Sequence, residues 1–236
     1  MKLLIDQGNT RLKFCTWDGK SFHLPEPAET ELPQFLAAKS EISEAWVSSV
    51  RHQEEHEKLS QLLSQHNIRT KFACTLDSQF GLQNSYPETS QMGVDRWLAM
   101  LGIWCEYKRG FILVDAGTAL TMDYVDNQGV HRGGHIIPGL TLMQRSLVTM
   151  TDRINLHIET APSDTDWASN TADAVQKGSL AVVVAYIEAM CSKLSQKHSL
   201  YLAGGDATII KQHLDINAII VNNLVFKGLV KYFSQG

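Results

Sequence analysis

The chain lacks the features that mark membrane, secreted and nucleic-acid-binding proteins. Its longest uninterrupted apolar run, residues 180–187, is much shorter than the roughly 18 residues that a membrane-spanning helix needs. Asp6 also comes too early for the apolar core of a signal peptide. The net charge is −4 and no segment concentrates Lys or Arg, which indicates no nucleic-acid or anionic-membrane partner. We expect a soluble, cytoplasmic protein that binds small molecules or proteins.

Paired cysteines and the common nucleotide-binding motifs are also missing. The 4 cysteines (Cys15, Cys74, Cys105 and Cys191) are scattered without a Cys-x-x-Cys pair, and we expect reduced core residues. Gly19-Lys20-Ser21 looks like the end of a Walker A loop, but Phe14 stands where that motif needs its first glycine. No Gly-x-Gly-x-x-Gly opens a helix, so the dinucleotide fingerprint is absent as well.

An internal repeat is the main organising feature of the sequence. An apolar strand at residues 2–5 leads into Asp6-Gln7-Gly8-Asn9-Thr10, and a second one at 111–114 leads into Asp115-Ala116-Gly117-Thr118, 109 residues further on. In each copy a strand, a turn and a third strand follow. Since such a repeat indicates two domains of one plan, we predict domains at residues 1–110 and 111–236, each opening with a β-meander.

Helices and strands alternate in the rest of the chain, which favours an α/β fold. The predicted strands are 45–50, 68–72, 130–137, 199–203 and 218–221; the predicted helices are 53–66, 91–107, 140–148, 170–194, 207–213 and 222–233; and 80–90 and 155–168 are expected to be irregular.

The two Asp-x-Gly turns have the chemistry of a phosphate site. Glycine lets the backbone approach an anion, turn N–H groups point at it, and Asn or Thr adds a donor. One such turn alone is more often an ordinary hairpin. A pair of them, one in each domain, predicts a nucleotide triphosphate held in a cleft between the domains.

A carboxylate and a guanidinium follow one another at a predicted helix start, in Gly93-Val94-Asp95-Arg96. An aspartate there often only complements the helix dipole. With Arg96 beside it and Tyr86 in the preceding loop, Asp95 suits a base that accepts a proton from a substrate hydroxyl, while Arg96 binds an anionic group.

Three further segments have both a structural and a functional reading. The glycines of 133–139 and of Gly204-Gly205 suit tight turns, and equally a close approach to phosphate or to a purine face. His52-Gln53-Glu54-Glu55-His56 fits the inverted zinc-peptidase motif. Its surroundings are polar throughout, so we interpret it as a solvated helix face.

Together, residues 6–13, 93–96, 115–119 and 133–139, in this order, resemble the type III pantothenate kinases of the acetate and sugar kinase, Hsp70 and actin superfamily. The resemblance implies two ribonuclease H-like (actin-like ATPase) domains, each a mixed β-sheet with flanking helices. It also implies ATP-dependent phosphorylation of pantothenate to 4′-phosphopantothenate, the first step of coenzyme A biosynthesis, with Mg²⁺ and a monovalent cation, K⁺ or NH₄⁺.

The resemblance also assigns roles to individual residues. It implies a homodimer in which Asp95 is the catalytic base and Asp115 is a ligand of the monovalent cation. The implied pantothenate contacts are Tyr86, Gly93, Val94, Asp95, Arg96 and, from the partner subunit, Thr171. The implied ATP contacts are Thr118 and a first phosphate loop of Asp6, Gln7, Gly8, Asn9, Thr10, Arg11, Leu12 and Lys13.

Two alternatives share these motifs. One is another small-molecule kinase of the same superfamily with a different acceptor. The other is a non-catalytic ATP-binding regulator descended from the kinase, against which the retained pair Asp95 and Arg96 argues, since a pure binder needs no base.

Overall fold

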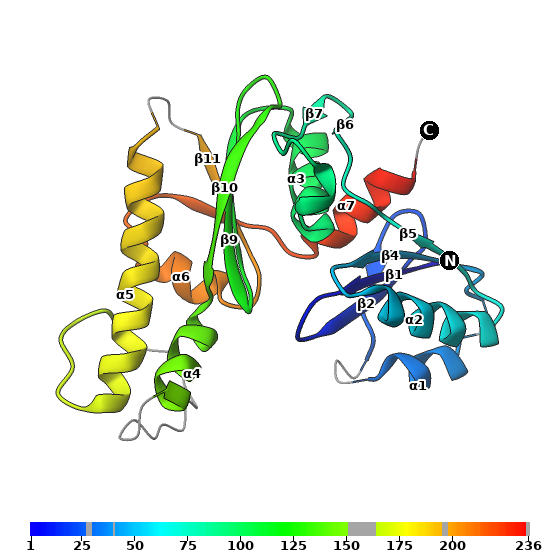
Figure 1. Ribbon diagram of the computed structural model, residues 1–236, viewed down its shortest axis with the longest axis horizontal. Coiled ribbons are helices and arrows are strands. Elements are labelled where there is room, and N and C mark those ends of the chain that lie inside the picture. Colours follow the sequence, from blue (N-terminus) through cyan, green and yellow to red (C-terminus); the bar gives the residue numbers. More distant parts are fainter. Residues whose placement is uncertain (27–29, 40, 151–163, 195–197, 235–236) are drawn as a thin grey trace. The chain divides into compact units, whose positions relative to one another are not determined.

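The computed structural model describes residues 1–26, 30–39, 41–150, 164–194 and 198–234 (Figure 1). The chain forms two compact units. Unit 1 comprises Met1–Lys108 together with Asn223–Gly236, and unit 2 comprises Arg109–Asn222.

Unit 1 contains a five-stranded sheet in the order β3-β2-β1-β4-β5. The first three strands are antiparallel neighbours, and β1, β4 and β5 run parallel. The strands are β1 (Lys2–Gln7), β2 (Leu12–Trp17), β3 (Phe22–His23), β4 (Glu44–Ser49) and β5 (Arg69–Phe72). Because β1 and β4 are parallel neighbours, the segments that follow them emerge at the same edge of the sheet.

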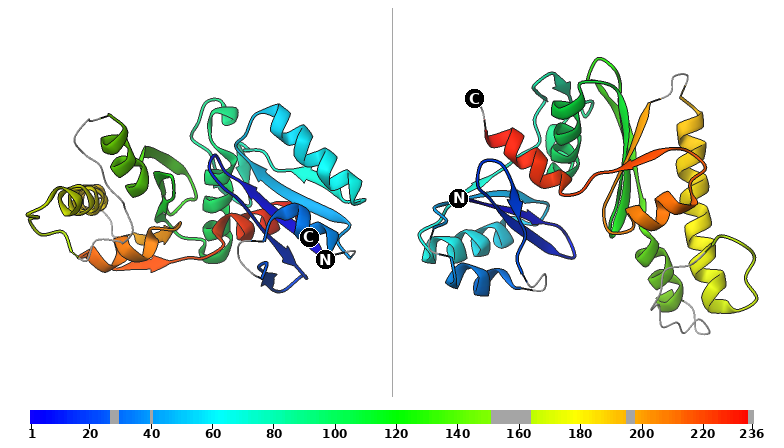
Figure 2. Two further views of the ribbon diagram at one scale, coloured as in Figure 1. Left: turned by 90° about the horizontal axis from the view of Figure 1, so that it is seen from below. Right: turned by 180° about the vertical axis from the view of Figure 1, so that it is seen from behind.

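Helices cover both faces of this sheet (Figures 1 and 2). Leu3 and Ile5 of β1 pack against α1 (Leu32–Ala37) and α2 (Gln53–Gln65) in one apolar core. Trp46 of β4 points to the opposite face, where its ring lies 5.3 Å from that of Phe233 in α7 (Leu224–Phe233). On this second face α7 packs along α3 (Val94–Tyr107).

Two glycines allow α3 and α7 to cross closely. A Cβ added at Gly228 would lie 2.1 Å from the carbonyl oxygen of Leu98, and one at Gly102 would lie 3.2 Å from the carbonyl oxygen of Leu224. This crossing places the C-terminal helix in unit 1, whereas the sequence-based division assigned it to the second domain. Nothing in the sequence indicated this packing, because α3 and α7 are more than 100 residues apart in the chain.

A buried carboxylate links three strands of the first sheet. Glu44 on β4 is 4% exposed and pairs with Lys2, with Arg69 at 2.8 Å and with Lys71 at 2.7 Å. Burial disfavours the charged form, but hydrogen bonds from the three cations outweigh it and lower the pKa of Glu44 to about 2.

Unit 2 repeats the plan of unit 1. Its five-stranded sheet has the order β10-β9-β8-β11-β12, again three antiparallel strands followed by parallel ones. Helices α5 and α6 pack their apolar side chains, such as Leu180 and Ile210, against one face of it. The elements are β8 (Phe111–Ala116), β9 (Ala119–Val125), β10 (His131–Pro138), α4 (Leu140–Met150), α5 (Thr171–Ser192), β11 (Ser199–Ala203), α6 (Ala207–His213) and β12 (Ala218–Ile220). The equal strand order confirms the predicted duplication and the α/β class.

The segment 80–90, expected to be irregular, is partly regular. It begins in a small hairpin of β6 (Ser78–Gln79) and β7 (Leu82–Gln83), whose turn residues Phe80 and Gly81 have φ of 52° and 86°. Positive φ at both turn residues is typical of a tight two-residue hairpin. A 3₁₀ turn (Thr89–Gln91) then precedes α3, which begins at Val94 and not at Gln91. Of the segment 155–168, residues 155–163 lie outside the described residues.

The expectation that all the cysteines are core residues needs correction. All four cysteines are free, but only Cys15 is buried, and Cys74 is exposed in the loop after β5. Helix α5 is long and apolar enough, by length and composition, to cross a membrane, although no run in the sequence suggested it. Its buried residues, such as Leu180 and Ile187, belong to the core of unit 2, and the core helix of a soluble protein passes the same test.

Candidate active site

The predicted first phosphate loop, residues 6–13, comprises the end of β1, the turn between β1 and β2, and the start of β2. Asp6 is the next-to-last residue of β1 and pairs in register with Lys13 on β2. The N–H of Gly8 donates to the carbonyl of Arg11 at 3.0 Å, which closes the turn. The side chains from Asn9 to Lys13 are exposed. The loop therefore presents a tight backbone turn and two cations, Arg11 and Lys13, to a ligand.

The connection between β4 and α2 holds this loop in place. The hydroxyl of Ser49 donates to Gln7 Oε1 at 2.9 Å, the N–H of Val50 donates to the carbonyl of Gln7 at 3.3 Å, and Arg51 Nη1 donates to the carbonyl of Asn9 at 2.8 Å. Sequence reasoning missed these residues, because only the pairing of β4 beside β1 brings them to the loop.

Asp95 and Arg96 occupy the first turn of α3. Asp95 is half-buried, and its Oδ1 accepts from the backbone N–H of Arg96 at 2.8 Å. Gly93 leaves room for this carboxylate, since an added Cβ would lie 2.5 Å from Asp95 Oδ1 and would displace it. That Cβ would also lie 3.8 Å from Val50, so the start of α3 and the first phosphate loop both adjoin the end of β4.

The guanidinium of Arg96 is buried and directed at Tyr86. Arg96 is 6% exposed, its Nη1 donates to the Tyr86 hydroxyl at 3.0 Å, and its Cζ lies 5.7 Å from the centre of the Tyr86 ring. The backbone N–H of Tyr86 is in turn held by Asn84 Oδ1 at 3.0 Å. The structure thus brings together the predicted acceptor residues Tyr86, Arg96 and Asp95 within unit 1. A buried guanidinium and a carboxylate on consecutive residues of one helix turn suit an acidic substrate with a hydroxyl to be deprotonated.

The predicted second phosphate loop, residues 115–118, joins β8 to β9 in unit 2. The N–H of Gly117 donates to the carbonyl of Ala119 at 3.1 Å, and Thr118 is exposed. Two glycines pack against this loop. A Cβ added at Gly139 would lie 2.1 Å from the carbonyl oxygen of Gly117, and one added at Gly204 would lie 2.7 Å from Asp115 Oδ1. Both predicted glycine turns therefore support the loop that carries Asp115 and Thr118.

Thr171 is the first residue of α5 and is exposed. The cap of this helix is Asn170, whose side-chain oxygen accepts from the N–H of Asp173 at 2.9 Å. The hydroxyl of Thr171 is therefore not needed as a helix cap.

The two histidines of the zinc-like motif lie on α2 without a metal-binding arrangement. His52 stands at the N-cap position and its side chain makes no capping bond, while His56 bonds Ser49 and stacks on Phe72. Among the residues that the structure describes, no group of three or more His, Cys, Asp and Glu is placed to hold a metal ion. The interpretation as a solvated helix face does not describe His56, which is half-buried and has specific contacts.

Two units with one strand order, each with an Asp-x-Gly turn at the end of its first strand, define an α/β protein with an actin-like fold. The solved structure of a candidate 2-dehydro-3-deoxygalactonokinase from Sinorhizobium meliloti has this fold, with a TM-score of 0.60 at 12% identity over 97% of each chain.

Sequence comparison narrows the class to one family. The sequence model of the type III pantothenate kinases matches residues 2–193. The type III pantothenate kinase of Marinobacter nauticus is 35% identical over 100% of this chain and 99% of its own length. That of Laribacter hongkongensis is 36% identical over 97% of both chains. The chain belongs to the type III pantothenate kinase family, enzymes that phosphorylate pantothenate with ATP in coenzyme A biosynthesis. The predicted family, fold and kinase activity are thereby confirmed, while the roles of single residues stay predictions.

Proposed function

We propose that Asp95 is the general base of pantothenate phosphorylation in this chain. It accepts the proton of the substrate's primary hydroxyl as the oxygen attacks the γ-phosphorus of ATP in line. Arg96 and Tyr86 bind the anionic pantothenate. The observation that carries this proposal is that the half-buried Asp95 carboxylate and the buried, Tyr86-bound guanidinium of Arg96 belong to consecutive residues, at a helix start that adjoins the same strand end as the first phosphate loop.

ATP binding is assigned to both phosphate loops. In the first, the turn around Gly8, with Arg11 and Lys13, binds phosphate oxygens; in the second, Thr118 contributes a hydroxyl. Mg²⁺ accompanies the phosphates and offsets their charge. Phosphoryl transfer needs little covalent help from the protein, so the positioning of the two substrates supplies most of the catalysis.

The direct test is ADP release by the purified protein with ATP, Mg²⁺ and K⁺, with and without pantothenate, monitored by a coupled enzyme assay. We expect release that depends on pantothenate. Release that is equal without pantothenate, or that depends on another hydroxyl compound instead, would contradict the acceptor assignment. Asp77→Asn, in the loop before the β6–β7 hairpin, serves as a carboxylate control for Asp95→Asn, since Asp77 has no role in the proposal.

Asp115 is proposed to bind the monovalent cation, K⁺ or NH₄⁺. Its carboxylate lies at the second phosphate loop, beside the backbone turn at Gly204, and a hard cation at this place needs an anionic oxygen ligand. Activity should therefore be higher in K⁺ or NH₄⁺ than in Na⁺, and Asp115→Ala should weaken this dependence. Equal turnover of the wild type in the three buffers would remove the assignment.

We further propose a cytoplasmic homodimer in which Thr171 completes the acceptor site of the partner subunit. Support comes from unit 2, where large apolar side chains are exposed on α4 and α5: Leu142 is 42% exposed, Leu147 40% and Val182 58%. Between these helices lies a groove of about 800 Å³, with Leu147, Thr171 and Val182 in its lining. A second copy of the chain would cover this apolar surface.

Mixing two inactive variants tests the shared site. With Asp95→Asn in one chain and Thr171→Arg in the other, a mixed dimer has one site damaged twice and one intact. Since random exchange makes about half of the dimers mixed, roughly a quarter of wild-type activity should return. Absence of recovery, with mixed dimers confirmed by differential tags, would place Thr171 outside the partner's site.

A further inference from the structure

We propose that Ser49 and His56 form a hydrogen-bonded chain that positions the first phosphate loop through Gln7. The inference rests on the proposed role of that loop in binding ATP. It adds two positioning residues that neither the phosphate motif nor the acceptor motif contains, and it gives a role to one histidine of the zinc-like segment.

The direction of the chain follows from its hydrogen bonds. Ser49 Oγ donates its only proton to Gln7 Oε1 at 2.9 Å, so it must accept from His56 Nε2, which also lies 2.9 Å away. The backbone N–H of Arg51 donates to the same oxygen at 3.3 Å. One donated and two accepted bonds use the full capacity of a serine hydroxyl. This hydroxyl is therefore fixed, and His56 carries its proton on Nε2.

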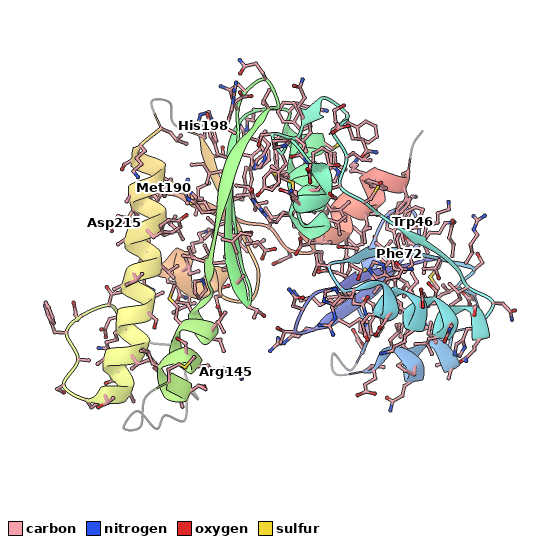
Figure 3. All side chains as sticks on the ribbon, in the orientation of Figure 1. Trp46, Phe72, Arg145, Met190, His198 and Asp215 are labelled. Carbon is pink, nitrogen blue, oxygen red and sulfur yellow. The ribbon has the colours of Figure 1, made fainter. Side chains whose placement is uncertain are left out.

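The ring of His56 is held by stacking. It projects from the first turns of α2 onto Phe72, the last residue of β5, with ring centres 4.6 Å apart and planes inclined by 23°. Figure 3 labels Phe72 in this region of unit 1. One face of the imidazole is thus covered, and its Nε2 edge meets Ser49. Without these contacts to Phe72 and Ser49, a histidine on a polar helix face would extend into solvent.

The hydrogen bonds from Ser49 and its neighbours engage the oxygen acceptors of the first phosphate loop, which are the groups that would repel a phosphate. Ser49 binds the side-chain oxygen of Gln7, and the neighbouring residues Val50 and Arg51 bind the carbonyls of Gln7 and Asn9. All three bonds engage acceptors. Phosphate oxygens need donors, so bracing the loop through its acceptors does not compete with the ligand. The loop is preorganised for an anion before ATP arrives, and binding then costs less ordering of the loop.

The test is a binding titration of the purified protein with the Mg²⁺ complex of a non-hydrolysable ATP analogue, in the absence of pantothenate, which gives the Kd of the analogue. His56→Phe keeps a ring on Phe72 but removes the donor, and Ser49→Ala removes the hydroxyl. Each should raise the Kd for the analogue about threefold to tenfold, the usual effect of one lost hydrogen bond. The KM for pantothenate should remain at the wild-type value, and the melting temperature should fall by only a few degrees.

Two rescue variants and one control separate positioning from general damage. Ser49→Thr keeps a hydroxyl and His56→Gln keeps an N–H donor at the same reach, so both should bind the analogue nearly as well as the wild type. His52→Ala changes the other histidine of the segment, which makes no capping bond, and should have no effect. A melting temperature that falls in all His56 variants, with no rescue by glutamine, would assign His56 a merely structural role.

The double variant Ser49→Ala/His56→Phe decides whether the two residues act as one chain. Since His56 reaches the loop only through Ser49, the double variant should bind no worse than Ser49→Ala alone. Effects that multiply would overturn the proposal, and so would unchanged binding in both single variants. A wild-type protein that fails to bind the analogue would instead refute the proposed ATP site itself, which keeps the two failures distinct.

Discussion

Gly204→Ala should damage the second phosphate loop, since the space beside Gly204 is filled by that loop. An added Cβ would lie 2.3 Å from the carbonyl oxygen of Ala116 and 2.7 Å from Asp115 Oδ1, and neither can stay in place. The φ of Gly204 is +91°, a region that costs a residue with a side chain about 1–2 kcal/mol. Overpacking adds about 1–3 kcal/mol. The expected loss of unfolding free energy is therefore about 2–5 kcal/mol.

Calorimetry of the purified variant measures this loss. In a chain of this size each kcal/mol corresponds to roughly 2–4 °C, so the melting temperature should fall by about 4–20 °C. The surviving folded protein should also show a weaker dependence on K⁺, because the Asp115 carboxylate is displaced. Gly205→Ala is the matched control: no atom lies within 4 Å of its added Cβ and its φ is outside the positive range. A Gly204→Ala variant that melts within 2 °C of both the wild type and this control would refute the reasoning.

Three further perturbations test other parts of the chain. Asp95→Asn should lower kcat about 100-fold to 10,000-fold while ATP binding persists, since it removes only the proton acceptor; a variant that keeps a third of wild-type turnover would reject the base. Gly228→Ala would place a Cβ 2.1 Å from the Leu98 carbonyl oxygen and should destabilise unit 1 by about 2–4 kcal/mol in urea unfolding, whereas Gly178→Ala on α5, with open space around it, should not. The pKa of Glu44 is lowered from 4.5 to about 2, so its ionised form contributes stability above about pH 4.5 that is lost as the pH falls toward 2. Glu44→Gln should lower the free energy of unfolding by roughly 1–3 kcal/mol at pH 7, less than the full pKa shift implies, because the cationic partners are partly exposed. It should also flatten the loss of stability at acid pH. Parallel curves of unfolding free energy against pH for the variant and the wild type, from urea unfolding, would contradict this account.

Local signals explain what could be predicted from the sequence. The two Asp-x-Gly turns, the meander around each of them and the cap at Asn170 depend on neighbouring residues, and the structure has them where they were expected. The order of four short motifs identified the family, since each motif lies within about eight consecutive residues. The sequence likewise predicted Asp95 at a helix start, although the helix begins three residues later than predicted.

Contacts between distant segments needed the tertiary structure. The sequence shows Gly102 and Gly228 as two isolated glycines, and only the crossing of α3 and α7 explains both and moves the C-terminal helix into unit 1. In the same way His56 appeared as part of a metal-like motif, until the parallel pairing of β4 with β1 brought Ser49 to Gln7.

The sequence by itself thus determined the kind of protein, its duplication and the residues proposed for its chemistry, because turns, caps and binding motifs are made by residues close together in the chain. The tertiary structure decided which segments support those residues: α7 behind α3, Gly139 and Gly204 against the second phosphate loop, and the β4–α2 connection against the first. The physical reason is that strand order and helix crossing arise from packing of apolar surfaces over the whole unit, which no local stretch of sequence encodes.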